Sequence, residues 1–221
     1  MHTREPAAIL DRVFIDIVGP LQNNADSYRN DAKYILTMMD DGSRFLRTVA
    51  LQNRRAETTM PAFLNNWVGI FGPPKEIICD NDKSFGGKSI KKFLAKYNCK
   101  VETTARYSPE MNAVERLHRS LMARIRTLRY SMGIPWSECL YMATYGYNVT
   151  QHCMLNVSPY ALVFSKIKDV DGKDVIIEKI NDARKDASTR AFELRNNGIA
   201  RKIQVGFHRT LNEVILCLLQ T

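Results

Sequence analysis

The sequence has no pair of cysteines spaced as Cys-x-x-Cys, no long apolar run and few histidines. Its five cysteines are odd in number and widely spaced, so the sequence supports neither a zinc knuckle nor a disulfide framework. No run approaches the roughly 20 apolar residues of a membrane-spanning helix. The polar residues 1–10 lack the apolar segment of a signal peptide. We therefore expect a soluble intracellular protein with no membrane partner.

Acidic residues are the minority among the charged ones. The chain has 23 Asp and Glu against 32 Lys and Arg, which gives a net charge of +9. A basic surplus suits a partner rich in phosphates, such as nucleic acid, because Lys and Arg displace its condensed counterions. A generic basic surface would give the same charge. With 45% hydrophobic residues, the 221-residue chain can bury one core and leave a short appendage.

Hydrophobic periodicity predicts alternating elements. The expected strands cover residues 11–18, 33–39, 44–51, 76–80 and 100–105, and the expected helices cover 55–71, 89–97, about 112–131 and 136–149. A three-stranded meander followed by strand–helix alternation predicts an α/β fold, a mixed five-stranded sheet flanked by helices. We expect residues 1–10 to be a leader, 11–165 the core, and 166–221 a charged, mostly helical linker or tail.

Three acids occupy unusual positions. Asp16 lies inside an apolar run typical of a strand buried on both faces, Asp80 ends a second apolar run, and Glu115 stands near the start of a long amphipathic helix. A buried carboxylate costs several kcal/mol unless it is paired, hydrogen-bonded or bound to a metal. Each acid alone has an ordinary structural explanation. Together they indicate a divalent-metal site for phosphoryl transfer.

The long helix has one apolar stripe, formed by Val114, Leu117, Leu121, Ile125, Leu128 and Met132. Glu115 lies about 100° around the axis from this stripe, with Arg119 and Arg126 on its own side. A metal site followed by phosphate-binding guanidinium groups would have this arrangement. The same arrangement would also arise without any metal. An acid near the start of a helix is favoured by the helix dipole, and Glu115 and Arg119 can form an ion pair four residues apart.

The residues also match a family. The matching segments are 14–21, 34–36, 40–44, 71–74, 77–81, 107–109, 112, 115–116, 119–121, 136, 147–148, 152 and 158–159. In this order they make residues 11–164 resemble the catalytic core of retroviral-type integrases, and more closely the integrases of long-terminal-repeat retrotransposons.

This resemblance implies a ribonuclease-H-like fold and a polynucleotidyl transferase. The family's acid triad falls on Asp16, Asp80 and Glu115, which would hold two Mg²⁺ or Mn²⁺ ions. Water would first attack near the 3′ end of the element's DNA, and the freed 3′-hydroxyl would then attack the target strand. The implied partners are element-end DNA, target DNA and further copies of the chain, and the implied location is the nucleus.

The residues expected to face DNA are less closely tied to the motif than the acids. They are Tyr107, Ser108, Asn112, Arg116 and Arg119, with Lys83 and Lys88 beside Asp80. The resemblance also has departures. The interval from Asp80 to Glu115 is 35 positions, one shorter than the family pattern, and the gap falls between Asn112 and Glu115. Inside a helix, such a gap would rotate Glu115 by about 100° relative to Asn112.

Two alternatives stay open. The chain would also fit an inactive or domesticated nucleic-acid-binding module derived from an integrase core. A further alternative is a ribonuclease-H-like nuclease that cuts nucleic acid without joining ends. Binding of a divalent cation at the three acids separates the first alternative from an enzyme, and joining of DNA ends separates the second.

Overall fold

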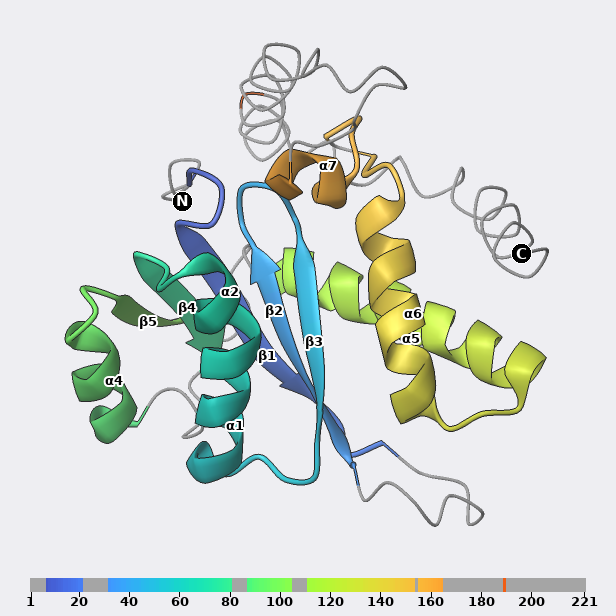
Figure 1. Ribbon diagram of the computed structural model, residues 1–221, viewed down its shortest axis with the longest axis horizontal. Helices are drawn as coiled ribbons and strands as arrows, with labels where there is room; N and C mark the ends of the chain where they lie inside the picture. The colour runs from blue at the N-terminus through green and yellow to red at the C-terminus, as the bar shows by residue number, and fades with distance from the viewer. Residues whose placement is uncertain are drawn as a thin grey trace. The chain divides into compact units, whose positions relative to one another are not determined.

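A mixed five-stranded sheet forms the centre of the protein. The computed structural model describes residues 7–21, 32–80, 87–104, 111–153, 155–164 and 189. The sheet has the strand order β3-β2-β1-β4-β5 (Figure 1). Strands β1, β2 and β3 are antiparallel neighbours, whereas β4 runs parallel to both β1 and β5. The predicted fold class is therefore confirmed, meander and parallel half included.

The strands agree with the predicted ones to within two residues. They are β1 (Arg12–Val18), β2 (Tyr34–Asp40), β3 (Leu46–Leu51), β4 (Glu76–Asp80) and β5 (Lys100–Thr104). The start of β3 differs most, because Arg44 takes a positive φ of 62° in the turn after β2. The ladder to β2 therefore begins only at Leu46, which pairs with Met39.

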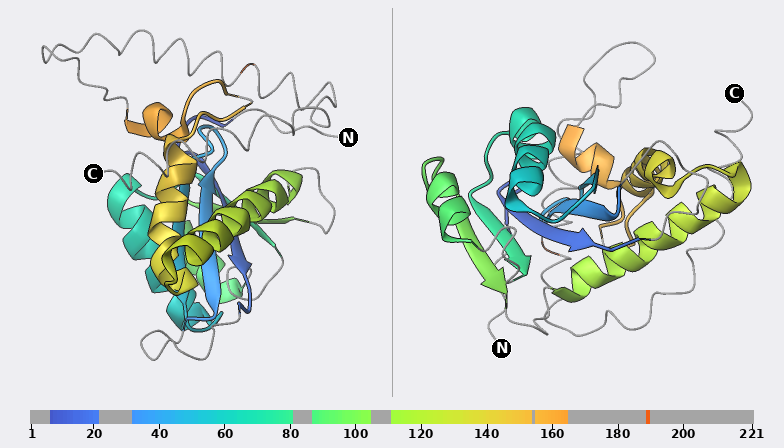
Figure 2. Two further views of the ribbon diagram at one scale, coloured as in Figure 1. Left: turned by 90° about the vertical axis from the view of Figure 1, so that its right-hand side faces the viewer. Right: turned by 90° about the horizontal axis from the view of Figure 1, so that it is seen from below.

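The helices that precede residue 150 cover both faces of the sheet. They are α1 (Ala56–Phe63), η1 (Leu64–Val68), α2 (Gly69–Phe71), α4 (Lys88–Ala95), α5 (Met111–Met132) and α6 (Trp136–Val149). Helices α1 and α4 lie on one face, and α5 and α6 lie on the other (Figures 1 and 2). No described helix is long and apolar enough to cross a membrane.

Strand β1 is buried on both sides, as its sequence predicted. Val13 and Ile15 pack with Phe63 and Trp67 of the α1 side, where both aromatic side chains are fully buried. Phe14 packs into the other cluster, with α5 and α6. Because side chains alternate along a strand, Asp16 follows Phe14 on the α5 side. The strand therefore places Asp16 between the sheet and the long helix.

Two helix predictions need correction. The helix expected over residues 55–71 is present without interruption from Ala56 to Phe71, but it is not α-helical throughout, because the π-helical η1 lies between α1 and α2. Pro61 lies inside α1, where it lacks the backbone N–H that the previous turn would bind. Met132, expected on the apolar stripe of α5, is 40% exposed because it is the last residue of that helix, whereas Val114, Leu117, Leu121, Ile125 and Leu128 are buried.

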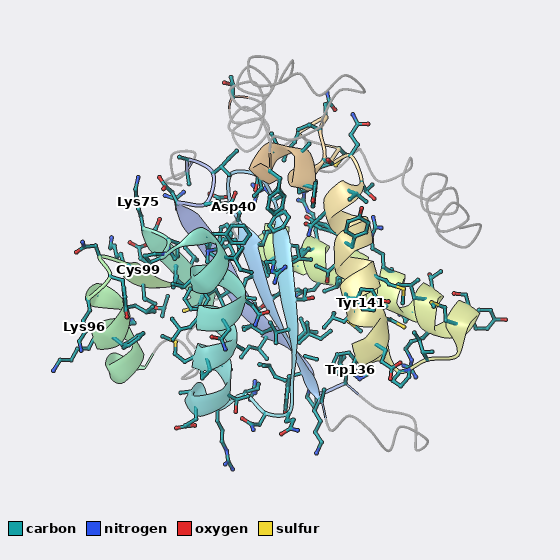
Figure 3. The ribbon with its side chains drawn as sticks, in the orientation of Figure 1. Asp40, Lys75, Lys96, Cys99, Trp136 and Tyr141 are labelled. Atoms are coloured by element: carbon teal, nitrogen blue, oxygen red, sulfur yellow. The ribbon has the colours of Figure 1, made fainter. Side chains whose placement is uncertain are left out.

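A buried network of charged residues closes one end of the sheet. Asp40 pairs with Val13 near the start of β1, and Figure 3 labels this aspartate. Its carboxylate accepts hydrogen bonds from Leu10 N (2.8 Å), Ser43 N (2.7 Å) and Ser43 Oγ (2.6 Å). Burial nevertheless raises the pKa of Asp40 to about 6. The two donors of Ser43 fix the turn that joins β2 to β3, and Leu10 N ties the segment before β1 to the same carboxylate.

Arg12 extends this network across the starts of the neighbouring strands. Its guanidinium group pairs with Glu76, the first residue of β4, and with Asp41 after β2 at 3.1 Å. Arg44 Nη1 lies 3.2 Å from the second oxygen of Asp41. One arginine on β1 is therefore tied to both adjacent strands, at the end of the sheet remote from Asp16.

Asn148 attaches helix α6 to the edge strand β3. Its Oδ1 accepts a hydrogen bond from Leu46 N at 2.9 Å, and its Nδ2 donates one to Leu46 O at 2.8 Å. The side-chain amide thus takes the place of a further strand at this position. Thr48 Oγ1 lies 2.6 Å from Thr144 Oγ1 one helical turn earlier and reinforces the attachment.

The described residues fall into two units, and the sheet belongs to the unit Ala7–Asn148. The other unit, Met1–Pro6 with Val149–Thr221, contains α7 (Pro159–Phe164), a helix that the sequence did not predict. The expected helical tail over residues 166–221 lies outside the described residues, apart from residue 189. The predicted division of the chain into a leader (1–10), a core (11–165) and a tail (166–221) stays a prediction.

We expect Asn148→Asp to lower the free energy of unfolding by about 3 kcal/mol, because it buries an unpaired charge against a carbonyl oxygen. Asn65→Asp, the same change at an exposed helical position, should stay within about 0.5 kcal/mol of the wild type. Urea unfolding at pH 7 measures both variants. Equal stability of the two variants would show that Asn148 does not anchor β3.

Candidate active site

Asp16 and Asp80 occupy equivalent positions on adjacent parallel strands. Ile15 of β1 pairs with Cys79 of β4, and each aspartate is the next residue on its strand. Both aspartates are partly buried. Neighbouring strands in register send paired side chains to the same face of a sheet, so both carboxylates belong to the face that α5 covers. The structure brings together these two members of the predicted triad.

Glu115 lies on α5 and is exposed. Its helical neighbours Val114 and Leu117 are buried against the sheet, at 3% exposure each. His118, one turn further along, reaches Asp16. Glu115 is therefore one turn before the residue that contacts Asp16, and about 60° around the helix axis from it.

The carboxylate of Asp16 has two different surroundings. Its Oδ1 accepts a hydrogen bond from Ile17 N at 2.8 Å, and its Oδ2 lies 3.7 Å from His118 Nδ1. Burial lowers the pKa of His118 to about 4. The imidazole is therefore neutral at pH 7, and its contact with Asp16 is not an ion pair under those conditions.

Thr37 joins the same group from β2. It is the antiparallel partner of Asp16 and is only 1% exposed. Its hydroxyl donates to the backbone oxygen of Asp16 at 3.1 Å and lies 3.1 Å from His118 Nε2. Sequence reasoning missed both Thr37 and His118. The signal for His118 was its spacing, four residues after Val114 and three after Glu115, which places it near the apolar stripe.

The other predicted residues are only partly described. Arg116 and Arg119 are exposed on α5, on the turns that follow Glu115. Lys88 begins α4 and Asn112 is in the first turn of α5, but their side chains lie outside the described part of the structure. Lys83, Tyr107 and Ser108 also lie outside the described residues.

The donor atoms suit a hard divalent cation. Carboxylate oxygens are the ligands that Mg²⁺ and Mn²⁺ prefer, and Asp16 and Asp80 present two of them side by side. Among the described residues, no group of three His, Cys, Asp or Glu side chains is close enough to hold a metal ion. Asp16 and Asp80 thus fit part of a cation site, which Glu115 does not complete in this arrangement.

The start of α5 bears on the short interval before Glu115. Because the helix begins at Met111, Asn112 and Glu115 are both inside it. Their three-residue separation fixes them about 300° apart around the axis. The buried stripe that starts at Val114 sets the rotation of the helix against the sheet. The packing of α5 on the sheet therefore sets the position of Glu115 around the helix axis, and the effect of the shorter interval stays a prediction.

Comparison with known proteins agrees with the fold. Residues 10–109 match the family described as the integrase core domain. The chain is 29% identical over 171 residues to the retrovirus-related Pol polyprotein from transposon 412 of Drosophila melanogaster. This alignment covers 76% of the chain and 13% of the polyprotein, so the chain spans about an eighth of that relative.

Solved structures with the same fold include two integrase cores. The catalytic core domain of BIV integrase has a TM-score of 0.57 at 17% identity, covering 71% of this chain and 95% of the other. The catalytic core domain of HTLV-2 integrase, in complex with magnesium and in a trimeric form, has a TM-score of 0.53 at 15% identity, covering 68% and 94%. Residues 10–109 therefore match the integrase core domain family, and the fold of the chain is that of retroviral integrase catalytic cores.

Proposed function

We propose that this chain is the catalytic core of a DNA-integration enzyme that performs metal-dependent phosphoryl transfer. The observation that supports this most is the pairing of Asp16 and Asp80 on adjacent parallel strands, beneath the helix that carries Glu115. The reaction would process the 3′ ends of the element's DNA and join them to target DNA. Because integration acts on chromosomal DNA, we propose the nucleus as its location.

Asp16, Asp80 and Glu115 would hold Mg²⁺ or Mn²⁺, as two ions. A bound divalent ion of this kind supplies Lewis-acid stabilisation of the attacking and leaving oxygens. The protein's own contribution is to hold the carboxylates in place. The β1–β4 ladder fixes Asp16 beside Asp80, and the hydrogen bond from Ile17 N orients one Asp16 oxygen. Glu115 would complete the set once DNA and cations are bound.

Exposed arginines on α5 support a DNA-binding surface beside the acids. Arg116 and Arg119 follow Glu115 by one and four residues and are accessible to a phosphate backbone. Arg116 and Arg119 would position the DNA strand, because phosphate contacts fix register and carry little sequence information. Tyr107, Ser108 and Asn112 before them, and Lys83 and Lys88 after Asp80, complete the proposed surface.

Strand transfer of short duplex ends into plasmid DNA in Mn²⁺ tests the acids. We expect Asp16→Asn, Asp80→Asn and Glu115→Gln each to lower the rate by at least about a hundredfold, since each removes a charged ligand worth several kcal/mol. Glu138→Gln, an exposed glutamate in the first turn of α6, is the matched control and should stay active.

An inactive wild type that still binds DNA would favour the nucleic-acid-binding module. Cleavage without joining would favour the nuclease. Joining by Glu115→Gln at the wild-type rate would exclude Glu115 from the site.

The arginines are tested through the salt dependence of DNA binding. We expect Arg119→Gln to weaken binding similarly for all sequences, and to reduce the slope of log K against log[salt] by about 1. Arg55→Gln, at the exposed start of α1 on the opposite face of the sheet, should leave the slope unchanged. Fluorescence anisotropy between 50 and about 200 mM salt measures both. An unchanged slope for Arg119→Gln would remove this residue from the DNA surface.

We further propose that the chain forms a homodimer or a higher oligomer. Helix α6 exposes Tyr141 (70%) and Tyr145 (51%) one turn apart, and Figure 3 shows Tyr141 on this helix. Paired exposed aromatic side chains are typical of the centres of interfaces.

We expect sedimentation velocity to detect a concentration-dependent oligomer that the double variant Tyr141→Ser/Tyr145→Ser weakens at least about tenfold. Tyr160→Ser, which changes an exposed tyrosine of α7, is the control. A monomer at high concentration would contradict the proposal.

A further inference from the structure

Two side chains outside the predicted motif, those of Thr37 and His118, meet at Asp16, and their hydrogen bonds determine where one proton lies. Thr37, His118 and Asp16 come from β2, α5 and β1 and share one face of the sheet. Thr37 is 1% exposed, so water does not compete for its hydroxyl group. The contacts of this hydroxyl therefore define the protonation of the imidazole.

The hydroxyl group of Thr37 has a single proton. It lies 3.1 Å from the backbone oxygen of Asp16, which can only accept, and 3.1 Å from Nε2 of His118. Both contacts are satisfied when the hydroxyl donates to the carbonyl and the imidazole donates to the hydroxyl oxygen. This places the imidazole proton on Nε2 and leaves a lone pair on Nδ1.

The unprotonated Nδ1 then faces a carboxylate oxygen. It lies 3.7 Å from Asp16 Oδ2, which is beyond hydrogen-bond distance. In this tautomer both atoms carry lone pairs, so both can donate to a cation that lies beside them. Imidazole nitrogen and carboxylate oxygen together form a common pair of ligands for transition-metal ions.

We propose that His118 Nδ1 is an additional donor to the cation site at Asp16, with Thr37 fixing the tautomer that makes this donor available. The proposal rests on the proposed function, because it concerns the same cation. It implies a mixed nitrogen–oxygen site that favours Mn²⁺ and Co²⁺ over Mg²⁺ more strongly than a site of carboxylates alone. Thr37 and His118 thereby tune which ion the site accepts.

The tautomer is measured first, on the metal-free, tag-free full chain. Long-range ¹H–¹⁵N correlation spectra should show His118 protonated on Nε2, with its signals assigned from their loss in His118→Asn. In Thr37→Val, which keeps the shape but removes the oxygen, this preference should weaken, while the signals of His152 stay unchanged. A proton on Nδ1 in the wild type would overturn the proposal.

Cation affinity is measured next by titration with Co²⁺, followed by its visible absorption, and with Mg²⁺ by calorimetry. We expect His118→Leu to lower Co²⁺ affinity about ten- to a hundredfold while Mg²⁺ affinity changes little. His118→Asn, which offers an oxygen and keeps polarity, should also lose Co²⁺ affinity if the leucine variant proves unstable. His152→Leu, the matched control, should bind both ions as the wild type does.

Asp16→Asn separates this proposal from the proposed function. If Asp16→Asn abolishes Co²⁺ binding and His118→Leu does not, the cation site stands and the role of His118 is overturned. A parallel fall of Co²⁺ and Mg²⁺ affinity in His118→Leu would also overturn it, because the selectivity would not depend on nitrogen. If neither variant affects binding, both the role of His118 and the cation site at Asp16 are wrong.

Discussion

The packing of α5 on the sheet is the interaction on which the site depends. Val114, Leu117 and Leu121 bury one stripe of the helix against the face that contains Phe14 and Ile78. A buried leucine contributes about 2 kcal/mol through removal of its surface from water, so this seam fixes the rotation of the helix firmly. That rotation directs His118 to Asp16 and places Glu115 one turn earlier, beside the seam.

One end of the sheet holds a structural network of charged residues, and the other end holds the carboxylates of the candidate site. At the starts of β1 and β4, Arg12 pairs with Glu76 and Asp41 and holds three strands in register. At the far end of the same strands, Asp16 and Asp80 are partly accessible and lie in equivalent positions. A register shift of one residue would turn one aspartate to the opposite face. The remote charged network therefore supports the geometry of the carboxylates.

His118 connects this scaffold to the chemistry of the site. Its neutral imidazole is held by Thr37, whose hydroxyl also binds the backbone of Asp16. A strand residue thus orients both the chain at Asp16 and the helix residue that faces its carboxylate. Replacement of any of these groups would alter the surroundings of Asp16 without touching the sheet's hydrophobic clusters.

The sequence by itself determined the strands, the long helix and the identity of the paired aspartates. Alternation and apolar runs are local signals, and a carboxylate inside the β1 run is conspicuous without any knowledge of its neighbours. Only the tertiary structure decided that Thr37 and His118 meet Asp16, because they lie 21 and 102 residues away along the chain. The anchor at Asn148 likewise depends on contact between distant segments, because Asn148 and Leu46 lie 102 residues apart in the sequence.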